Sequence, residues 1–182
     1  MCPSQPLRQS NTSTLAHRPD GRKTKVRMNY WLMKSEPDVF GIEHLAKSPK
    51  RTASWTGVRN YQVRNLLRDD FQKKDLAFFY YSSCPEPGVY GVMEVTGAAH
   101  PDATQFDPKD EYYDAKSTRA NPRWYAVDVT LKQTFKHPVF LQELRDSASL
   151  KTLQILRRGN RLSITPVTPE EWKTIMQMAG EK

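Results

Sequence analysis

Apolar and polar positions along the chain predict mostly β-strands. The runs 29–33 and 75–82 are short, apolar and rich in aromatic residues, as buried strands often are. In 89–95 and 124–134, apolar residues recur at every second position, which is typical of strands. A last strand is predicted over 161–167. Because these strands mostly follow one another, we expect a domain rich in sheet.

Four segments show helical patterns. Apolar residues share one face in 39–47 and in 59–71, and Asp38 can cap the first of these helices. A short helix is predicted over 141–146, and a longer one over 169–178 begins on the capping signal Thr168-Pro169-Glu170-Glu171. Helices inserted between strands predict a mixed α/β (α+β) domain, a small barrel with helices attached to it.

The chain divides into an extension and one domain. Residues 1–27 are rich in Ser, Thr, Pro, Arg and Gln and nearly lack large apolar side chains, so burial cannot offset the entropy of ordering them. They are predicted to form a disordered N-terminal extension, and the domain is expected to span 28–180. Within it, the polar segment 99–122 carries Tyr112 and Tyr113. A loop of this length is more often functional than idle.

The net charge of +8 is a weaker sign of nucleic-acid binding than its size suggests. Residues 1–27 hold six basic residues and one acidic residue, a net +5, which leaves +3 for residues 28–182. Inside the domain, 47–74 and 151–161 are basic, whereas 102–114 is acidic. If the two basic stretches meet, they form a positive rim that can follow phosphates. An ordinary solvated face explains them equally well.

Cysteine content and hydropathy point to the cytoplasm. Cys2 and Cys84 have no partner at metal-ligand spacing, so neither a structural zinc site nor a disulfide is expected. No apolar run approaches the roughly 20 residues that span a bilayer, and the first residues lack the apolar stretch of a secretory signal. We expect a soluble cytoplasmic protein without metal or cofactor, and the sequence leaves its oligomeric state open.

Candidate catalytic groups are sparse. None of the four histidines lies in a recognisable nucleophile motif, and no glycine-rich loop is present to cradle phosphates or a dinucleotide. Lys34 and Glu36 form the only pair that resembles an acid–base set, and a salt bridge or a ligand contact explains them more simply. No catalytic residue is predicted.

Two segments, 30–37 and 55–65, each place a tryptophan directly before polar and charged residues. Flat aromatic faces beside hydrogen-bonding groups suit a nucleobase. Pocket wall and core packing stay equally open for Trp31 and Trp55, whereas Trp124 is expected in the core. Asn60 can bond a base edge and Arg64 can reach phosphate.

Ordered motifs extend this pattern along the domain. They are Tyr30-Trp31-Leu32-Met33-Lys34-Ser35-Glu36-Pro37, Trp55-x-Gly57-Val58-Arg59-Asn60-Tyr61, Phe78-Phe79-Tyr80-Tyr81-Ser82, Pro87-Gly88-Val89-x-Gly91, Phe106-Asp107-Pro108, Tyr112-Tyr113-Asp114, Asn121-Pro122-Arg123-Trp124 and Arg161-Leu162-Ser163-Ile164-x-Pro166-Val167. Through these motifs the chain resembles the EVE domain family from about residue 29 to residue 178. The resemblance implies a PUA-like fold, a small twisted β-barrel with flanking helices, related to the YTH and ASCH domains.

The resemblance also implies nucleic-acid binding, with an aromatic-walled pocket for a flipped or modified base. Carried over by motif, the ligand-binding residues are Trp31, Lys34, Ser35, Trp55, Gly57, Val58, Asn60, Tyr61 and Tyr80. The residues expected at the nucleic-acid backbone are Arg59, Arg64, Arg158 and Arg161. The family often has an acidic residue after the second tryptophan, and here that position is Thr56, so a carboxylate contact from it is not expected.

The sequence thus favours a non-enzymatic reader of a modified base in DNA or RNA. One alternative is an ASCH-like ribonuclease or small-molecule hydrolase that uses Lys34 with Glu36 or Tyr80. Another is an interaction scaffold in which the pocket is vestigial and the basic rims alone bind. The sequence decides neither the choice between DNA and RNA nor the modification.

Overall fold

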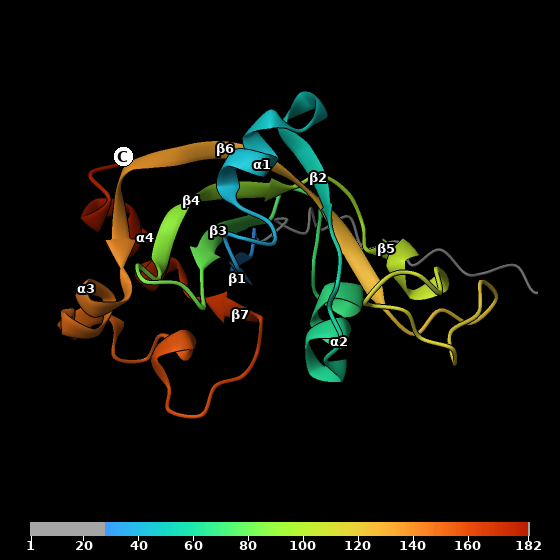
Figure 1. Ribbon diagram of the computed structural model, residues 1–182. Helices are drawn as coiled ribbons and strands as arrows, with labels where there is room; N and C mark the ends of the chain where they lie inside the picture. The colour runs from blue at the N-terminus through green and yellow to red at the C-terminus, as the bar shows by residue number, and fades with distance from the viewer. Residues whose placement is uncertain (1–27, 182) are drawn as a thin grey trace, which may run out of the picture.

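Within residues 28–181, a seven-stranded mixed sheet forms the centre of the fold, with four α-helices around it (Figure 1). The computed structural model describes residues 28–181, and the predicted N-terminal extension lies outside the described residues. The strands are β1 (Tyr30–Ser35), β2 (Thr52–Trp55), β3 (Leu76–Tyr81), β4 (Gly88–Val95), β5 (His100–Pro101), β6 (Tyr125–Phe140) and β7 (Ile164–Val167). The helices are α1 (Ile42–Lys47), α2 (Tyr61–Asp69), α3 (Leu141–Asp146) and α4 (Pro169–Met178).

The sheet is curled but open. Its hydrogen-bonded order is β2-β6-β4-β3-β1-β7, and β5 pairs with β6. Across residues 28–181 no pairing joins β7 to β2, so the mixed α/β class is confirmed but closure into a barrel is not observed. Register shifts in β3–β4 and β4–β6 accompany the bend, and β6 arches over the other strands in Figure 1.

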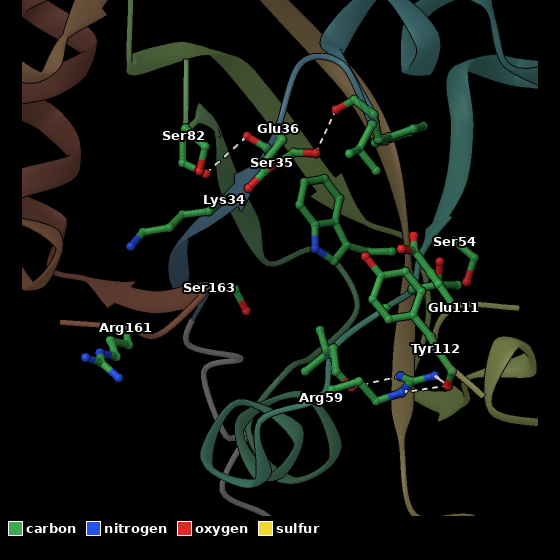
Figure 2. A pocket seen from close by; sticks show the side chains of 17 residues that line it. Lys34, Ser35, Glu36, Ser54, Arg59, Ser82, Glu111, Tyr112, Arg161 and Ser163 are labelled. Carbon is green, nitrogen blue, oxygen red and sulfur yellow. Dashed lines mark hydrogen bonds between the residues drawn. The ribbon is translucent and has the colours of Figure 1, made fainter. Parts of the chain in front are cut away.

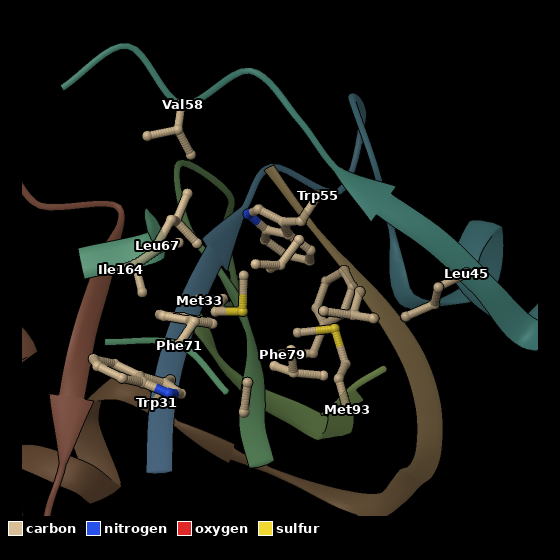
Figure 3. Packing of buried hydrophobic residues seen from close by; sticks show 14 of the residues in the cluster. Trp31, Met33, Leu45, Trp55, Val58, Leu67, Phe71, Phe79, Met93 and Ile164 are labelled. Carbon is tan, nitrogen blue, oxygen red and sulfur yellow. The ribbon is translucent and has the colours of Figure 1, made fainter. Parts of the chain in front are cut away.

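Two hydrophobic clusters lie on the two faces of the sheet. Along β1, Trp31 and Met33 join the first cluster, whereas Leu32 between them joins the second, because successive side chains of a strand point to opposite faces. Residues of α1 and α2 pack into the first cluster, and those of α3 and α4 into the second. Figure 3 shows part of the first cluster.

Most predicted elements are present, with shifted boundaries. The segments 141–146 and 169–178 are helical as predicted, and the Thr168 side chain caps the second by accepting from the Glu171 N–H. The first helix starts at Ile42 instead of Val39 and is capped at Gly41, so the predicted cap at Asp38 is wrong. Val39 is 62% exposed. Strand β2 was not predicted, because Thr52–Trp55 is short and lacks an apolar run.

The segment 99–122 contains β5 and a 3-10 helix at Ala103–Phe106, so this long connection has secondary structure of its own. Asp102 and Gln105 within it are buried. Among residues 28–181, no helix has both the length and the apolar character needed to span a bilayer.

Candidate functional site

A cavity of about 760 Å³ opens where β1, β2 and β3 end. β1 and β3 run parallel, so their C-terminal ends reach the same edge of the sheet. The loop before α2, the segment 99–122 and the chain before β7 complete the walls. The lining residues are Lys34, Ser35, Glu36, Val39, Phe40, Ser54, Trp55, Thr56, Gly57, Val58, Arg59, Ser82, Ser83, Glu111, Tyr112, Arg161 and Ser163.

Asp102 fixes the loop between β2 and α2. Its fully buried carboxylate accepts hydrogen bonds from the Gly57 N–H (2.9 Å) and the Arg59 guanidinium (2.8 Å). The backbone N–H and hydroxyl of Thr104 also donate to it. Burial alone would raise the pKa of Asp102, but these hydrogen bonds outweigh it and hold the pKa below its usual value. A buried anion thus ties the cavity loop to the segment 99–122.

Arg59 is a structural residue in this arrangement. Besides Asp102, its guanidinium donates to the carbonyl oxygens of Val58 and Tyr112 and to the Thr104 hydroxyl. These contacts use all five of its N–H groups. In this structure Arg59 therefore has no free N–H for the phosphate contact that was predicted, although the residue does line the cavity.

Gly57 and Tyr112 form a close contact at the cavity wall. Gly57 has φ +80°, and a Cβ placed on it would lie 2.9 Å from the Tyr112 ring. Glycine is therefore required twice, for the left-handed backbone and for the approach of the ring. Arg59 holds the Tyr112 carbonyl in this position.

Trp55 is the aromatic residue whose polar group stays available to the cavity. Its ring meets Phe79 (5.4 Å between centroids, 76°) and Phe40 (6.0 Å, 89°) edge to face, which anchors it to the core. Its indole N–H has no acceptor among residues 28–181, yet the nitrogen is not sealed from solvent. Trp55 thus offers a ring edge and a free donor to a ligand.

Trp31 does not reach this cavity. It is 4% exposed, stacks on Phe71 at 4.3 Å, and donates its indole N–H to Asp75 at 2.9 Å. Figure 3 places Trp31 and Trp55 at different ends of the same cluster. Core packing was one of the two possibilities left open, and it is the position that Trp31 takes in this structure, where its side chain packs against Phe71.

Charges in the cavity are mixed. Lys34 and Arg161 lie on one side, and Glu111 and Tyr112 lie on the other (Figure 2). Partial burial lowers the pKa of Lys34 from its ordinary value. Glu36 also lines the cavity, and within the described part of the chain it forms no ion pair. Donors and acceptors therefore face one another across the space.

Ser35 lines the cavity and also hydrogen-bonds to the backbone. Its hydroxyl donates to the Phe40 carbonyl at 2.7 Å, which closes the turn between β1 and α1. The oxygen keeps its lone pairs for a ligand. Lys34, Ser35, Trp55, Gly57 and Val58 from the predicted ligand set, and Arg161 from the backbone set, thus share one cavity.

Other predicted residues lie elsewhere. Asn60 caps α2 by accepting from the Gln62 and Val63 N–H groups. Tyr61 stacks on Trp124 at 4.9 Å outside the cavity, and Arg64 lies over the Tyr61 ring. Arg158 is not in the lining, and Tyr80 lines a neighbouring cavity instead.

Phe40, Glu111 and Ser163 line the cavity but were not predicted to do so. Phe40 and Glu111 each lie within a few residues of a family motif and Ser163 lies inside one, but only long-range packing brings Glu111 and Ser163 to the end of β1. Trp124 is buried, as expected, and donates to Asp114 at 2.7 Å.

The family model described as the EVE domain matches residues 29–178. The chain therefore belongs to the EVE domain family. Within that family it is similar to thymocyte nuclear protein 1. The identity to the Gallus gallus protein is 39% over 179 residues, covering 89% of this chain and 73% of that protein. The identity to the Homo sapiens protein is 40% over 167 residues, with coverages of 82% and 73%.

Solved structures show the same fold. The human THYN1 protein in complex with DNA containing 5-methylcytosine matches with a TM-score of 0.79 and 39% identity, covering 85% of this chain and 99% of that one. A protein from Pseudomonas putida matches with a TM-score of 0.78 and 49% identity, with coverages of 82% and 99%.

Proposed function

We propose that this EVE domain is a non-enzymatic reader of a modified base in nucleic acid. The observation that carries the proposal is the main cavity itself. Trp55 and Tyr112 give it aromatic walls, the Trp55 indole N–H has no acceptor in the part of the chain that the structure describes, and charged groups of both signs surround the space. A nucleobase has flat faces and an edge of donors and acceptors, so it matches this mixed lining better than a phosphate does.

The relative crystallised with 5-methylcytosine DNA supports the proposal. In this chain, Trp55 and Tyr112 flank the flipped base, while Ser35, Glu36 and Glu111 accept hydrogen bonds from its edge. Flipping a base costs a few kcal/mol, and each aromatic platform returns roughly 1–3 kcal/mol. Glu36 and Glu111 supply the carboxylates that Thr56 cannot supply. Selectivity for the modification follows from the shape of the cavity.

A binding comparison tests this function. Fluorescence anisotropy would measure the affinity for oligonucleotides with one 5-methylcytosine and for the same sequences unmodified, as DNA and as RNA. We expect tighter binding to a modified strand, and about tenfold weaker binding of that strand by Trp55→Phe, which removes the free donor and narrows the wall. Trp31→Phe is the matched control and should bind as the unchanged chain does. Equal binding by Trp55→Phe and the unchanged chain would show that the base does not meet Trp55.

The enzyme alternative predicts a different result. Burial raises the pKa of Tyr80 to about 12, so this phenol stays protonated at neutral pH and is a poor base. Labelled DNA and RNA incubated with the protein should remain intact. Cleavage that disappears in Lys34→Ala would favour the hydrolase. Binding that survives Trp55→Phe but falls steeply with salt would favour the scaffold.

A further inference from the structure

A second cavity of about 260 Å³ adjoins the main one. Lys34, Ser82 and Ser83 line both cavities, so the two meet across the turn that follows β3. The remaining residues of the second cavity are Tyr80, Cys84, Pro87, Leu141, Arg145 and Ile155. Arg145 comes from α3, and no residue of α3 lines the main cavity.

The chemistry of the second cavity differs from that of the first. Lys34 and Arg145 are its two charged residues, and the lining contains no Asp or Glu. Over residues 28–181, neither cation forms an ion pair. The main cavity, by contrast, contains Glu36 and Glu111. Two cations without a facing acid suit an anionic group.

Tyr80 supplies an unused polar group to this cavity. It is 3% exposed, and its hydroxyl has no hydrogen-bond partner in the described part of the chain, yet the oxygen is not fully enclosed. Burial raises the pKa of Tyr80 to about 12, although Arg145 opposes the shift, so the hydroxyl remains a donor at neutral pH. A hydroxyl without a partner among residues 28–181 is free to donate a hydrogen bond to an anion in the cavity.

We propose that the second cavity binds the phosphodiester group next to the base held in the main cavity, through Lys34, Tyr80 and Arg145. The inference rests on the proposed function, because the phosphate belongs to the nucleotide whose base is read. A base and its phosphate are joined through one sugar, which suits two adjoining cavities of unlike chemistry. Lys34, which lines both, lies where the sugar must pass.

The test uses Arg145→Gln in the full chain. Arg145 is an exposed residue of α3, so the variant should fold. At fixed salt we expect Arg145→Gln to weaken binding about fivefold to tenfold, by the same factor for modified and unmodified oligonucleotides. The slope of log K against log salt concentration should fall in magnitude by about one. Binding of the free modified nucleoside, which lacks phosphate, should not change. Arg68→Gln removes the same charge from an exposed pair with Asp69 and should change none of these values.

Tyr80→Phe provides a second variant, since it removes only the unpartnered hydroxyl. It should weaken oligonucleotide binding without altering the preference for the modified base. If Arg145→Gln and Tyr80→Phe leave oligonucleotide affinity and salt slope unchanged, the phosphate site is refuted while base reading stands. If modified and unmodified strands bind equally but both variants weaken them, base reading fails and the phosphate site survives. Inorganic phosphate that stabilises the unchanged chain but not Arg145→Gln, with unaffected oligonucleotide binding, would show a free-phosphate site and overturn the proposal.

Discussion

The two tryptophan-led segments look alike in sequence and serve different purposes in the structure. Trp31 stacks on Phe71 and donates to Asp75, so both its ring and its N–H are used inside the protein. Trp55 is anchored on Phe79 and lines the cavity, and its N–H has no acceptor among residues 28–181. The comparison teaches that an unused polar group, and not the presence of an aromatic ring, distinguishes a ligand wall from a core residue.

The same distinction separates the arginines. Arg59 lines the cavity, yet all of its N–H groups donate hydrogen bonds to other residues of the protein. Arg161 lines the cavity without an ion pair in residues 28–181. A positive charge near a cavity is therefore available to a ligand only after its internal hydrogen bonds are counted.

The largest expected effect is on stability and comes from Asp102, whose hydrogen bonds hold the loop after Trp55 against the segment 99–122. Asp102→Asn leaves the Arg59 guanidinium without its anion, and loss of one partner of a buried pair costs about 3–5 kcal/mol. Chemical denaturation should show this loss of unfolding free energy. Asp69→Asn, which breaks the exposed pair with Arg68, should cost less than about 1 kcal/mol. Equal losses in the two variants would mean that the Asp102 network does not hold the loop.

Trp31→Phe and Trp55→Phe compare how much each tryptophan contributes to the free energy of unfolding. Trp31→Phe removes the hydrogen bond to the buried Asp75 carboxylate, and bonds to charged groups contribute about 1.5–3 kcal/mol. Trp55→Phe leaves no acceptor among residues 28–181 unpaired, so its loss of unfolding free energy should be smaller. Thermal and denaturant unfolding would compare the two. A larger loss for Trp55→Phe would place Trp55 with the core residues.

Gly57→Ala tests the close contact between Gly57 and the Tyr112 ring. A left-handed backbone costs an alanine about 1–2 kcal/mol, and here the added Cβ also meets the Tyr112 ring at 2.9 Å. Gly180→Ala is matched, because Gly180 has φ +72° but open space around the added Cβ. We expect Gly57→Ala to lose more stability than Gly180→Ala, and to weaken binding of the modified strand several-fold. Unchanged binding would exclude Tyr112 as a wall.

The smallest effect is the pH dependence of the Asp102 network. Because the folded state lowers the pKa of Asp102, its stabilisation is complete above the unfolded value of about 3.9. It is lost as the pH falls through the folded pKa. As the pH falls below about 4, the unchanged chain should therefore lose stability more steeply than Asp102→Asn. Parallel acid profiles of unfolding free energy would contradict this account.

Local pattern was enough for much of the fold. The periodicity of 141–146 and 169–178 predicts both helices, because their caps and apolar faces are encoded within a few residues. Strand β2 was missed since Thr52–Trp55 becomes a strand through its pairing with β6, far along the chain. Barrel closure likewise depends on whether β2 and β7 meet, which no local pattern specifies.

By itself, the sequence determined the mixed α/β class, most elements and membership of the EVE family, because these depend on short-range periodicity and on ordered motifs. Only the tertiary structure decided that Trp31 is buried in the core, that the Arg59 guanidinium is bound by Asp102 and neighbouring acceptors, and that Tyr80 lines a second cavity. The physical reason is that strand pairing and register fix the direction of each side chain. Whether a polar atom is satisfied depends on residues far away in sequence, as Trp31 and Asp75 show.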